Sequence, residues 1–166
     1  MRIINYPNKI LREKSKNIKQ ISSSKIQGFI PLFIDLMIKH DGIGLSAPQV
    51  GLNINLIAVN FQEGVKVLIN PRICWKNWFK KNVIEEGCLS FPGIFGFVKR
   101  PFSVWVKYRD AEGKIMLEKF SGLAATVVQH EIDHLRGVLF IDKIIKFTRG
   151  EKYFQSLKLN ANNEEK

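Results

Sequence analysis

The sequence contains few cysteines and few acidic residues, and it has no long hydrophobic run. Only Cys74 and Cys88 are present in 166 residues, which excludes a disulfide-rich secreted scaffold. No apolar segment approaches the roughly 18 residues of a transmembrane helix, and the first residues lack the hydrophobic core of a secretory signal. We therefore expect a bacterial-type cytoplasmic protein with free thiols and no membrane contact.

Acidic residues are outnumbered by basic ones. The chain has 15 Asp and Glu against 26 Lys and Arg, a net charge of +11 and a pI near 9.8. This balance favours contact with phosphate-rich partners such as ribosomal RNA. Compositional drift is the alternative, because isoleucine and asparagine are abundant together with lysine. No nucleic-acid motif accompanies the charge, so we expect no sequence-specific nucleic-acid binding.

Length and periodicity predict the fold. Without a repeat or a low-complexity linker, residues 1–166 are expected to form a single domain, with a polar tail at 160–166 that frays. An amphipathic helix over 24–40 contains Pro31, which should kink it or delay its start. A basic C-terminal helix is expected over 143–159. Strands are expected over residues 55–60, 65–70, 75–80, 83–85, 103–108 and 114–120.

Strands in the middle of the chain and helices towards both ends indicate an α+β fold. Short loops between most of the strands favour antiparallel pairing. A further helix is expected between Ser121 as N-cap and Gly137 as C-terminal stop. We expect antiparallel sheets packed around this central, metal-binding helix, with another helix at the C-terminus.

The central helix carries the motif H-E-x-x-H at residues 130–134. Residues four apart share one helix face, so His130 and His134 can bind one cation while Glu131 flanks it. A chance pair of histidines on a core helix is the alternative interpretation. Glu131 argues against this alternative, because burying a carboxylate on a helix costs free energy unless a cation or a hydrogen-bond donor compensates its charge.

A catalytic metal site needs a third protein ligand. The longer pattern H-E-x-x-H-x-x-G-x-x-H would supply a third histidine at position 140. That position is Phe140, and His134 is the last histidine of the chain. Glu151 stays open as a downstream carboxylate ligand. Cys88 is the stronger candidate, because a thiolate binds divalent iron, zinc or nickel well. Cys74 is interpreted as a small buried hydrophobe.

Gly42, Gly44 and Ala47 match the spacing of a dinucleotide-binding fingerprint. That fingerprint needs a strand before it and a helix after it, and here the order is reversed. We reject that interpretation. The two glycines suit close approach of another backbone, such as a peptide that adds a strand, and they suit an ordinary glycine turn equally well.

Three segments together resemble the peptide deformylase family in order and spacing. They are residues 42–49, 86–90 and 129–135, which read GIGLSAPQ, EGCLS and QHEIDHL. The resemblance implies an enzyme that removes the N-formyl group from the initiator N-formylmethionine of nascent polypeptides and releases formate. It also implies one Fe²⁺ per chain, with Zn²⁺, Ni²⁺ or Co²⁺ as substitutes.

The resemblance also implies residue roles. The metal ligands would be Cys88, His130 and His134; a hydroxide on the metal attacks the formyl carbon, and Glu131 acts as general acid and base. The oxyanion donors would be the side-chain amide of Gln49 and the backbone N–H of Leu89. Substrate-binding residues would be Ile43, Gly44, Glu86 and Val127. Arg100 would pair with Asp133 as a brace for the site.

Two other functions remain as alternatives. A metalloprotease shares the helix and the base, but Cys88 as a ligand and the missing third histidine argue against it. A basic RNA-binding protein with a structural metal would need four protein ligands, and the sequence supplies three obvious ones. The nascent N-formylmethionyl peptide is the expected partner, with a ribosome contact through the basic surface and the C-terminal helix.

Overall fold

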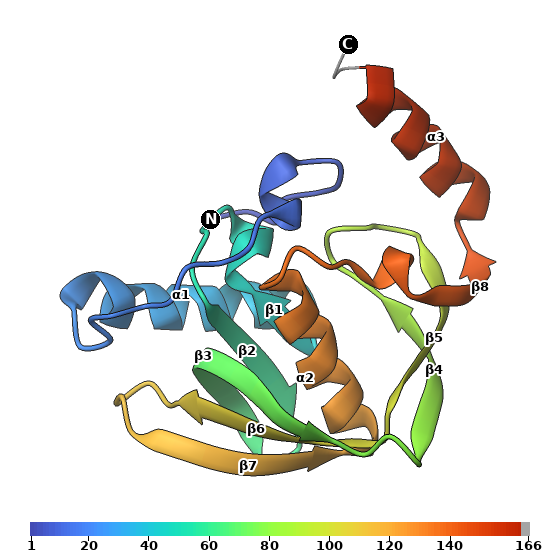
Figure 1. Cartoon of the computed structure of the whole chain (residues 1–166). Helices are drawn as coiled ribbons and strands as arrows, with labels where there is room; N and C mark the ends of the chain where they lie inside the picture. Colours follow the sequence, from blue (N-terminus) through green and yellow to red (C-terminus); the bar gives the residue numbers. More distant parts are fainter. Residues whose placement is uncertain (164–166) are drawn as a thin grey trace.

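The computed structural model describes the backbone of residues 1–163 and the side chains of residues 1–159. Two antiparallel sheets lie on either side of a central helix, α2, in Figure 1. This arrangement confirms the expected α+β fold. Within the described residues, no helix is both long and apolar enough to cross a membrane.

The N-terminal part holds a short 3₁₀ helix at Lys9–Arg12 and the helix α1 at Ser24–Lys39. The helix predicted over 24–40 is confirmed, and it continues through Pro31. Pro31 lies on the exposed side of α1, whereas Phe33 and Met37 are fully buried. The apolar face of α1 therefore covers the core formed with β2 and β3.

The larger sheet has the strand order β1-β2-β3-β6-β7. Its strands are β1 Gly44–Ser46, β2 Leu56–Phe61, β3 Gly64–Lys76, β6 Ser103–Arg109 and β7 Ile115–Ser121. The prediction of separate strands at 65–70 and 75–80 was wrong, because β3 crosses Pro71 and ends at Lys76. The β3–β6 register shifts between Ile69 and Arg72, and this irregularity accommodates a proline that cannot donate to the ladder.

The smaller sheet has the strand order β4-β5-β8. Its strands are β4 Lys81–Gly87, β5 Phe95–Pro101 and β8 Ile144–Arg149, and the helix α3 follows at Glu151–Asn163. The helix predicted over 143–159 was therefore wrong in its first part, which pairs with β5 as a strand. Of the tail predicted to fray at 160–166, α3 includes 160–163, and 164–166 lie outside the described residues.

Helix α2 spans Gly122–His134, with Ser121 at the N-cap position as predicted. One side of α2 packs Ala125, Val128 and Ile132 onto the larger sheet, where they form a buried cluster with side chains from β2, β3 and β6. Because this side faces the larger sheet, the side with the two histidines is turned towards the second sheet. The fold thereby places the H-E-x-x-H motif at the junction of both sheets.

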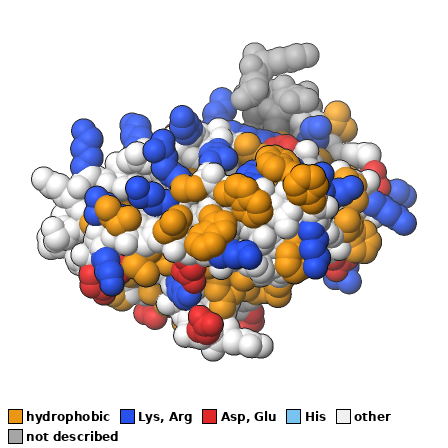
Figure 2. All heavy atoms as spheres, turned by 60° about the horizontal axis from the view of Figure 1, so that its bottom comes forward, with side chains coloured by type: hydrophobic (Ala, Val, Ile, Leu, Met, Phe, Trp, Pro, Cys, Tyr) orange, Lys and Arg blue, Asp and Glu red, His pale blue; other side chains and the backbone are white. Residues whose placement is uncertain are grey.

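The face of β6 and β7 that points away from α2 is exposed. Val104 and Val106 of β6 are buried in the cluster with α2, whereas Trp105 and Lys107, which alternate with them, are exposed. Figure 2, in which the lower side of Figure 1 comes forward, shows hydrophobic side chains mixed with Lys and Arg on this side of the molecule.

Candidate metal centre and substrate groove

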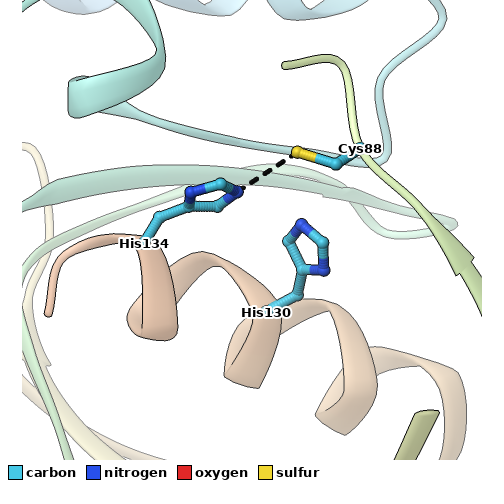
Figure 3. A group of neighbouring side chains, drawn as sticks. All are labelled: Cys88, His130 and His134. Atoms are coloured by element: carbon cyan, nitrogen blue, oxygen red, sulfur yellow. Dashed lines mark hydrogen bonds between the residues drawn. The ribbon is translucent and has the colours of Figure 1, made fainter. Parts of the chain in front are cut away.

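Three side chains from two separate segments meet beside α2. His130 and His134 extend from the helix towards Cys88, which directly follows β4 (Figure 3). The three ligand atoms lie within 4.8 Å of one another, and Cys88 Sγ is 3.3 Å from His134 Nε2. The structure therefore brings together the three residues that the sequence analysis proposed as ligands, although 41 residues lie between Cys88 and His130.

The geometry of this cluster suits a cation. Bonds of about 2.3 Å to sulfur and 2.0–2.1 Å to nitrogen in a tetrahedral site imply a ligand separation of roughly 3.6 Å. The separation of 3.3 Å between Cys88 Sγ and His134 Nε2 is close to that value. One thiol and two imidazoles are also the donor types that divalent iron and zinc accept.

A chain of buried polar contacts orients His130. Its Nδ1 donates to Glu86 Oε2 at 2.9 Å, so that Nε2 faces the cluster. Arg100 in turn donates to both Glu86 oxygens, at 2.5 and 2.9 Å, and to Asp133 at 2.6 Å. The predicted pairing of Arg100 with Asp133 is confirmed. Such outer partners fix the orientation of a metal-binding imidazole and raise its basicity.

Acidic groups surround His130. Burial opposes the positive charge on His130, yet hydrogen bonds to Cys88 and Glu86 and the charge of Glu131 raise its pKa to about 10. Burial likewise opposes ionisation of Glu86, but hydrogen bonds from His130 and Arg100 lower its pKa to about 2. The acidic groups around His130 therefore favour a positive charge on that side of the cluster.

The pKa of His134 is shifted in the opposite direction to that of His130. Burial, together with the nearby positive charges of His130 and Arg100, holds the pKa of His134 well below its ordinary value. Its imidazole is therefore neutral, which is the form that binds a metal. Its Nδ1 is buried and has no hydrogen-bond partner among the described residues.

Glu131 is a buried carboxylate next to the first histidine. Its Oε2 has no hydrogen-bond partner among the described residues, and only 4% of the residue is exposed. Burial raises its pKa to about 7, although the positive charges of His130 and Arg100 oppose that rise. A buried carboxyl with such a pKa can both accept and donate a proton near neutral pH.

Gln49 supplies an oriented amide beside the metal ligands. Its Oε1 accepts from Ser46 N at 2.9 Å and from Ser46 Oγ at 2.8 Å, which fixes the amide plane. Its Nε2 is then directed at Cys88 Sγ and at Ser90 Oγ, each 3.3 Å away. An N–H donor of fixed direction therefore lies at the edge of the cluster.

A cavity of about 540 Å³ opens in front of the candidate metal ligands. This volume is within the range of about 300–1,000 Å³ that is typical of small-molecule sites. Every residue that the sequence analysis proposed for substrate binding lines it, namely Ile43, Gly44, Glu86 and Val127. Gln49, Leu89, Glu131, Cys88 and His130 line it too.

Sequence reasoning missed part of this groove. Ile84, Phe91, Phe95 and Leu123 extend its apolar wall, and the exposed His40, which is the C-cap residue of α1, lines it too. The double hydrogen bond between Arg100 and Glu86 was also missed. The two residues lie on neighbouring strands, but Glu86 pairs with Gly96 and Arg100 with Asn82, so their contact runs along the sheet and is not a pairing of opposite residues.

Comparison with known proteins gives consistent matches. A family model described as polypeptide deformylase matches residues 1–150. The chain is 46% identical over 150 residues to peptide deformylase 1B of Arabidopsis thaliana, covering 87% of this chain and 54% of that protein. A peptide deformylase of Caldanaerobacter subterraneus is 42% identical over 143 residues, covering 86% of this chain and 88% of that protein. The chain spans only about half the length of its plant relatives.

Solved structures agree with the sequence matches. The crystal structure of a peptide deformylase from Thermotoga maritima has a TM-score of 0.83 and 38% identity, covering 86% of this chain and 96% of that one. The Arabidopsis thaliana enzyme 1B in complex with an inhibitor has a TM-score of 0.87 and 40% identity, covering 99% of this chain and 92% of that one.

Proposed function

The chain belongs to the polypeptide deformylase family, and we propose that it removes the N-formyl group from the initiator N-formylmethionine of nascent polypeptides. The reaction breaks the C–N bond of the formamide with water and yields formate and a free amine. The proposal rests on the cluster of Cys88, His130 and His134 beside a groove that Cys88 and His130 line. Glu131 lines the same groove, and its buried Oε2 has no hydrogen-bond partner among the described residues.

Cys88, His130 and His134 would hold a divalent cation, and we propose Fe²⁺, with Zn²⁺, Ni²⁺ or Co²⁺ as substitutes. When bound, the cation would supply Lewis-acid chemistry, which makes a water molecule nucleophilic at neutral pH and polarises a carbonyl. The mixed thiol and imidazole donors support this choice of metals. Glu86 and Arg100 would keep His130 oriented during the reaction.

Proton transfer is assigned to Glu131. Its Oε2, which has no hydrogen-bond partner among the described residues, would accept the proton of the attacking water and pass it to the departing amine nitrogen. The backbone N–H of Leu89 and the amide of Gln49 would donate to the oxygen that becomes negative. The bond from Ser46 to Gln49 supports this role, since it directs Nε2 and not Oε1 towards the cluster.

We propose that the peptide lies between two edge strands. β1 is an edge of the larger sheet and β4 an edge of the smaller one, and both contribute to the groove. Gly44 of β1 and Glu86 of β4 would then contribute backbone hydrogen bonds, because the Glu86 carboxylate is already bound to Arg100 and His130. Ile43, Leu89 and Val127 would form the apolar pocket for the methionine side chain.

The expected partner is the nascent peptide. A ribosome contact through the basic surface and the C-terminal helix is supported by the net charge of +11 and by exposed lysines of α3 such as Lys152 and Lys158. A cytoplasmic location stays a prediction.

Substrate class is the direct test of this proposal. The metal-loaded protein should release formate from a formyl-Met-Ala-Ser peptide and leave the acetylated and unblocked forms of the same peptide intact. Mass spectrometry of the three reactions distinguishes deformylation from peptide-bond cleavage. Cleavage of the unblocked peptide would instead establish the metalloprotease alternative.

A further inference from the structure

All three tryptophans of the chain are exposed, and they belong to one region. Trp75 ends β3, Trp105 lies on β6, and Trp78 lies in the turn after β3. Their exposed fractions are 50%, 37% and 65%. Tryptophan is on average a well-buried residue, so three exposed copies in one region indicate a contact surface.

The strand register places two of these tryptophans within one cationic face. Trp75 pairs with Trp105, and Trp105 pairs with Lys119 of β7. The neighbouring row across the same strands contains Arg72, Lys107 and Leu117. Directly opposed residues share one side of a sheet, so these rows form a single surface, here called the Trp75–Trp105 face.

Among the described residues of β3, β6 and β7, none that belongs to the Trp75–Trp105 face is acidic. Its exposed members on the three strands are Arg72, Trp75, Trp105, Lys107, Arg109, Ile115, Leu117 and Lys119. The alternate residue of β7, Glu118, points to the other side, where it binds Tyr108 and Lys66. Four cations and two indoles therefore face solvent without a local counter-charge on the face.

The turn after β3 also combines exposed aromatic side chains with lysines. Asn77 Oδ1 accepts from the backbone N–H groups of Phe79 and Lys80, each at 3.1 Å, and this fixes the turn. Phe79 is fully exposed, and Lys76 Nζ lies 5.6 Å from the ring centroid of Trp78. The ordered turn thus places two more aromatic rings and two lysines next to the end of β3, although Lys76 itself pairs with Val104 on the α2 side of the sheet.

We propose that the Trp75–Trp105 face binds single-stranded RNA without sequence preference. Bases would stack on Trp75 and Trp105, and phosphates would pair with the cations between and beside them. Charge complementarity supports this partner, since the face is cationic and the chain carries a net charge of +11. The choice of RNA rests on the proposed function, because a nascent polypeptide is made next to RNA.

The arrangement of charges favours RNA over an anionic membrane. A surface that inserts into lipid gathers its apolar side chains and keeps cations at the rim. Here Lys107 is paired directly with Leu117, and Lys119 with Trp105, so insertion would bury the cations with the rings. Single-stranded RNA alternates flat bases with phosphates, so it matches a surface on which rings and cations alternate.

Fluorescence anisotropy with a labelled 12-nucleotide single-stranded RNA, titrated at 50 and 200 mM KCl, tests the proposal. Trp75→Ala with Trp105→Ala should weaken binding at least about 10-fold. Trp75→Phe with Trp105→Phe should keep most of the affinity, because phenylalanine still offers a ring on which a base can stack. Lys107→Gln with Lys119→Gln should reduce the slope of log K against log salt by about 1.4. This second pair leaves the indoles intact, so the test does not depend on the Ala variant folding.

The matched control is Lys99→Gln with Lys146→Gln, which removes the same charge from exposed positions of β5 and β8. This smaller sheet lies on the other side of α2 from β7 in Figure 1. We expect this variant to bind the RNA nearly as tightly as wild type. Equal losses from both charge pairs, wild-type binding by the tryptophan variant, or wild-type binding only to phosphatidylglycerol vesicles would each overturn the proposal.

RNA binding is measured without a peptide substrate, so its outcome is separate from deformylation. The Lys107 and Lys119 variant should release formate from a short formylated peptide at the wild-type rate, since neither residue lines the groove. An inactive wild type that still binds RNA through this face would contradict the proposed function and leave the RNA surface in place.

Discussion

Arg100 and Glu86 form a double hydrogen bond in the interior, with Nε to Oε1 at 2.5 Å and Nη2 to Oε2 at 2.9 Å. Both side chains are almost completely buried, at 3% and 5% exposure. Glu86 continues the chain of contacts to His130, and Arg100 continues it to Asp133. The orientation of a candidate metal ligand therefore depends on a guanidinium that never touches the metal cluster.

Arg100→Gln should weaken metal retention. The substitution leaves Glu86 buried without its cation, and loss of an outer partner of a metal ligand typically costs about 10- to 100-fold in affinity. Metal content after graded chelator dialysis measures the effect. Lys143→Gln is the control, because Lys143 also binds Asp133 but is 37% exposed. Equal metal content in both variants and in wild type would show that Arg100 does not support metal binding.

Gly44→Ala should disable catalysis while leaving the cation in place. A Cβ at Gly44 would lie 2.5 Å from Glu131 Oε1 and 2.9 Å from Val127 Cγ1, so the carboxylate must move. A displacement of about 1 Å at a catalytic group costs roughly 10²-fold in rate. Turnover and metal content should be compared with Gly28→Ala, where nothing lies within 4 Å of the added Cβ. Wild-type turnover of Gly44→Ala would argue against the assigned position of Glu131.

Gln49→Leu should lower kcat by about 10² to 10³, the usual cost of losing one oxyanion donor. KM should change little if the donor acts mainly in the transition state. Since Gln49 also binds Ser46, thermal melting must accompany the kinetics. Ser46→Ala is the matched control, because it removes that bond and keeps the amide. A KM effect alone would assign Gln49 to substrate binding.

The Arg12–Asp142 pair should make stability depend on pH in the acid range. Burial acts against ionisation of Asp142, but its hydrogen bond from Arg12 prevails and holds its pKa below the ordinary value of 3.8. A pKa lowered by folding gives stability that is complete above 3.8 and is lost as the pH falls through the folded value.

Asp142→Asn should therefore have a lower Tm than wild type at pH 7, and the difference should shrink below pH 4. The decrease should be modest, because the two side chains are 40% and 35% exposed. Asp35→Asn, at an exposed carboxylate of α1, is the control for the change of charge itself. A Tm difference that is constant with pH would mean that the pair does not titrate as described.

Elements whose signal is local could be predicted from the sequence. The spacing of His130 and His134 requires only helical periodicity, and the end signals at Ser121 and Gly137 lie nearby, so α2 was predicted correctly. The apolar spacing over 24–40 likewise predicted α1 to within one residue. Cys88 was selected by chemistry and by the family resemblance.

Features decided by tertiary pairing could not be predicted in this way. Ile144 and Phe147 fit a helical pattern as well as a strand, and pairing with β5 decides for the strand. Pro71 indicated a break, but the shifted register lets β3 continue. The contact of Arg100 with Glu86 depends on two neighbouring strands of a sheet whose existence the sequence only partly indicated.

Formate release from a formyl-Met peptide is the most direct measurement. The protein should be purified without oxygen, loaded with Fe²⁺ or Ni²⁺, and compared with Glu131→Gln and Cys88→Ala at known metal content. We expect rapid release by wild type, almost none by metal-replete Glu131→Gln, and poor metal retention by Cys88→Ala. A folded, fully metallated wild type that releases no formate, or a Glu131→Gln variant as active as wild type, would contradict this expectation.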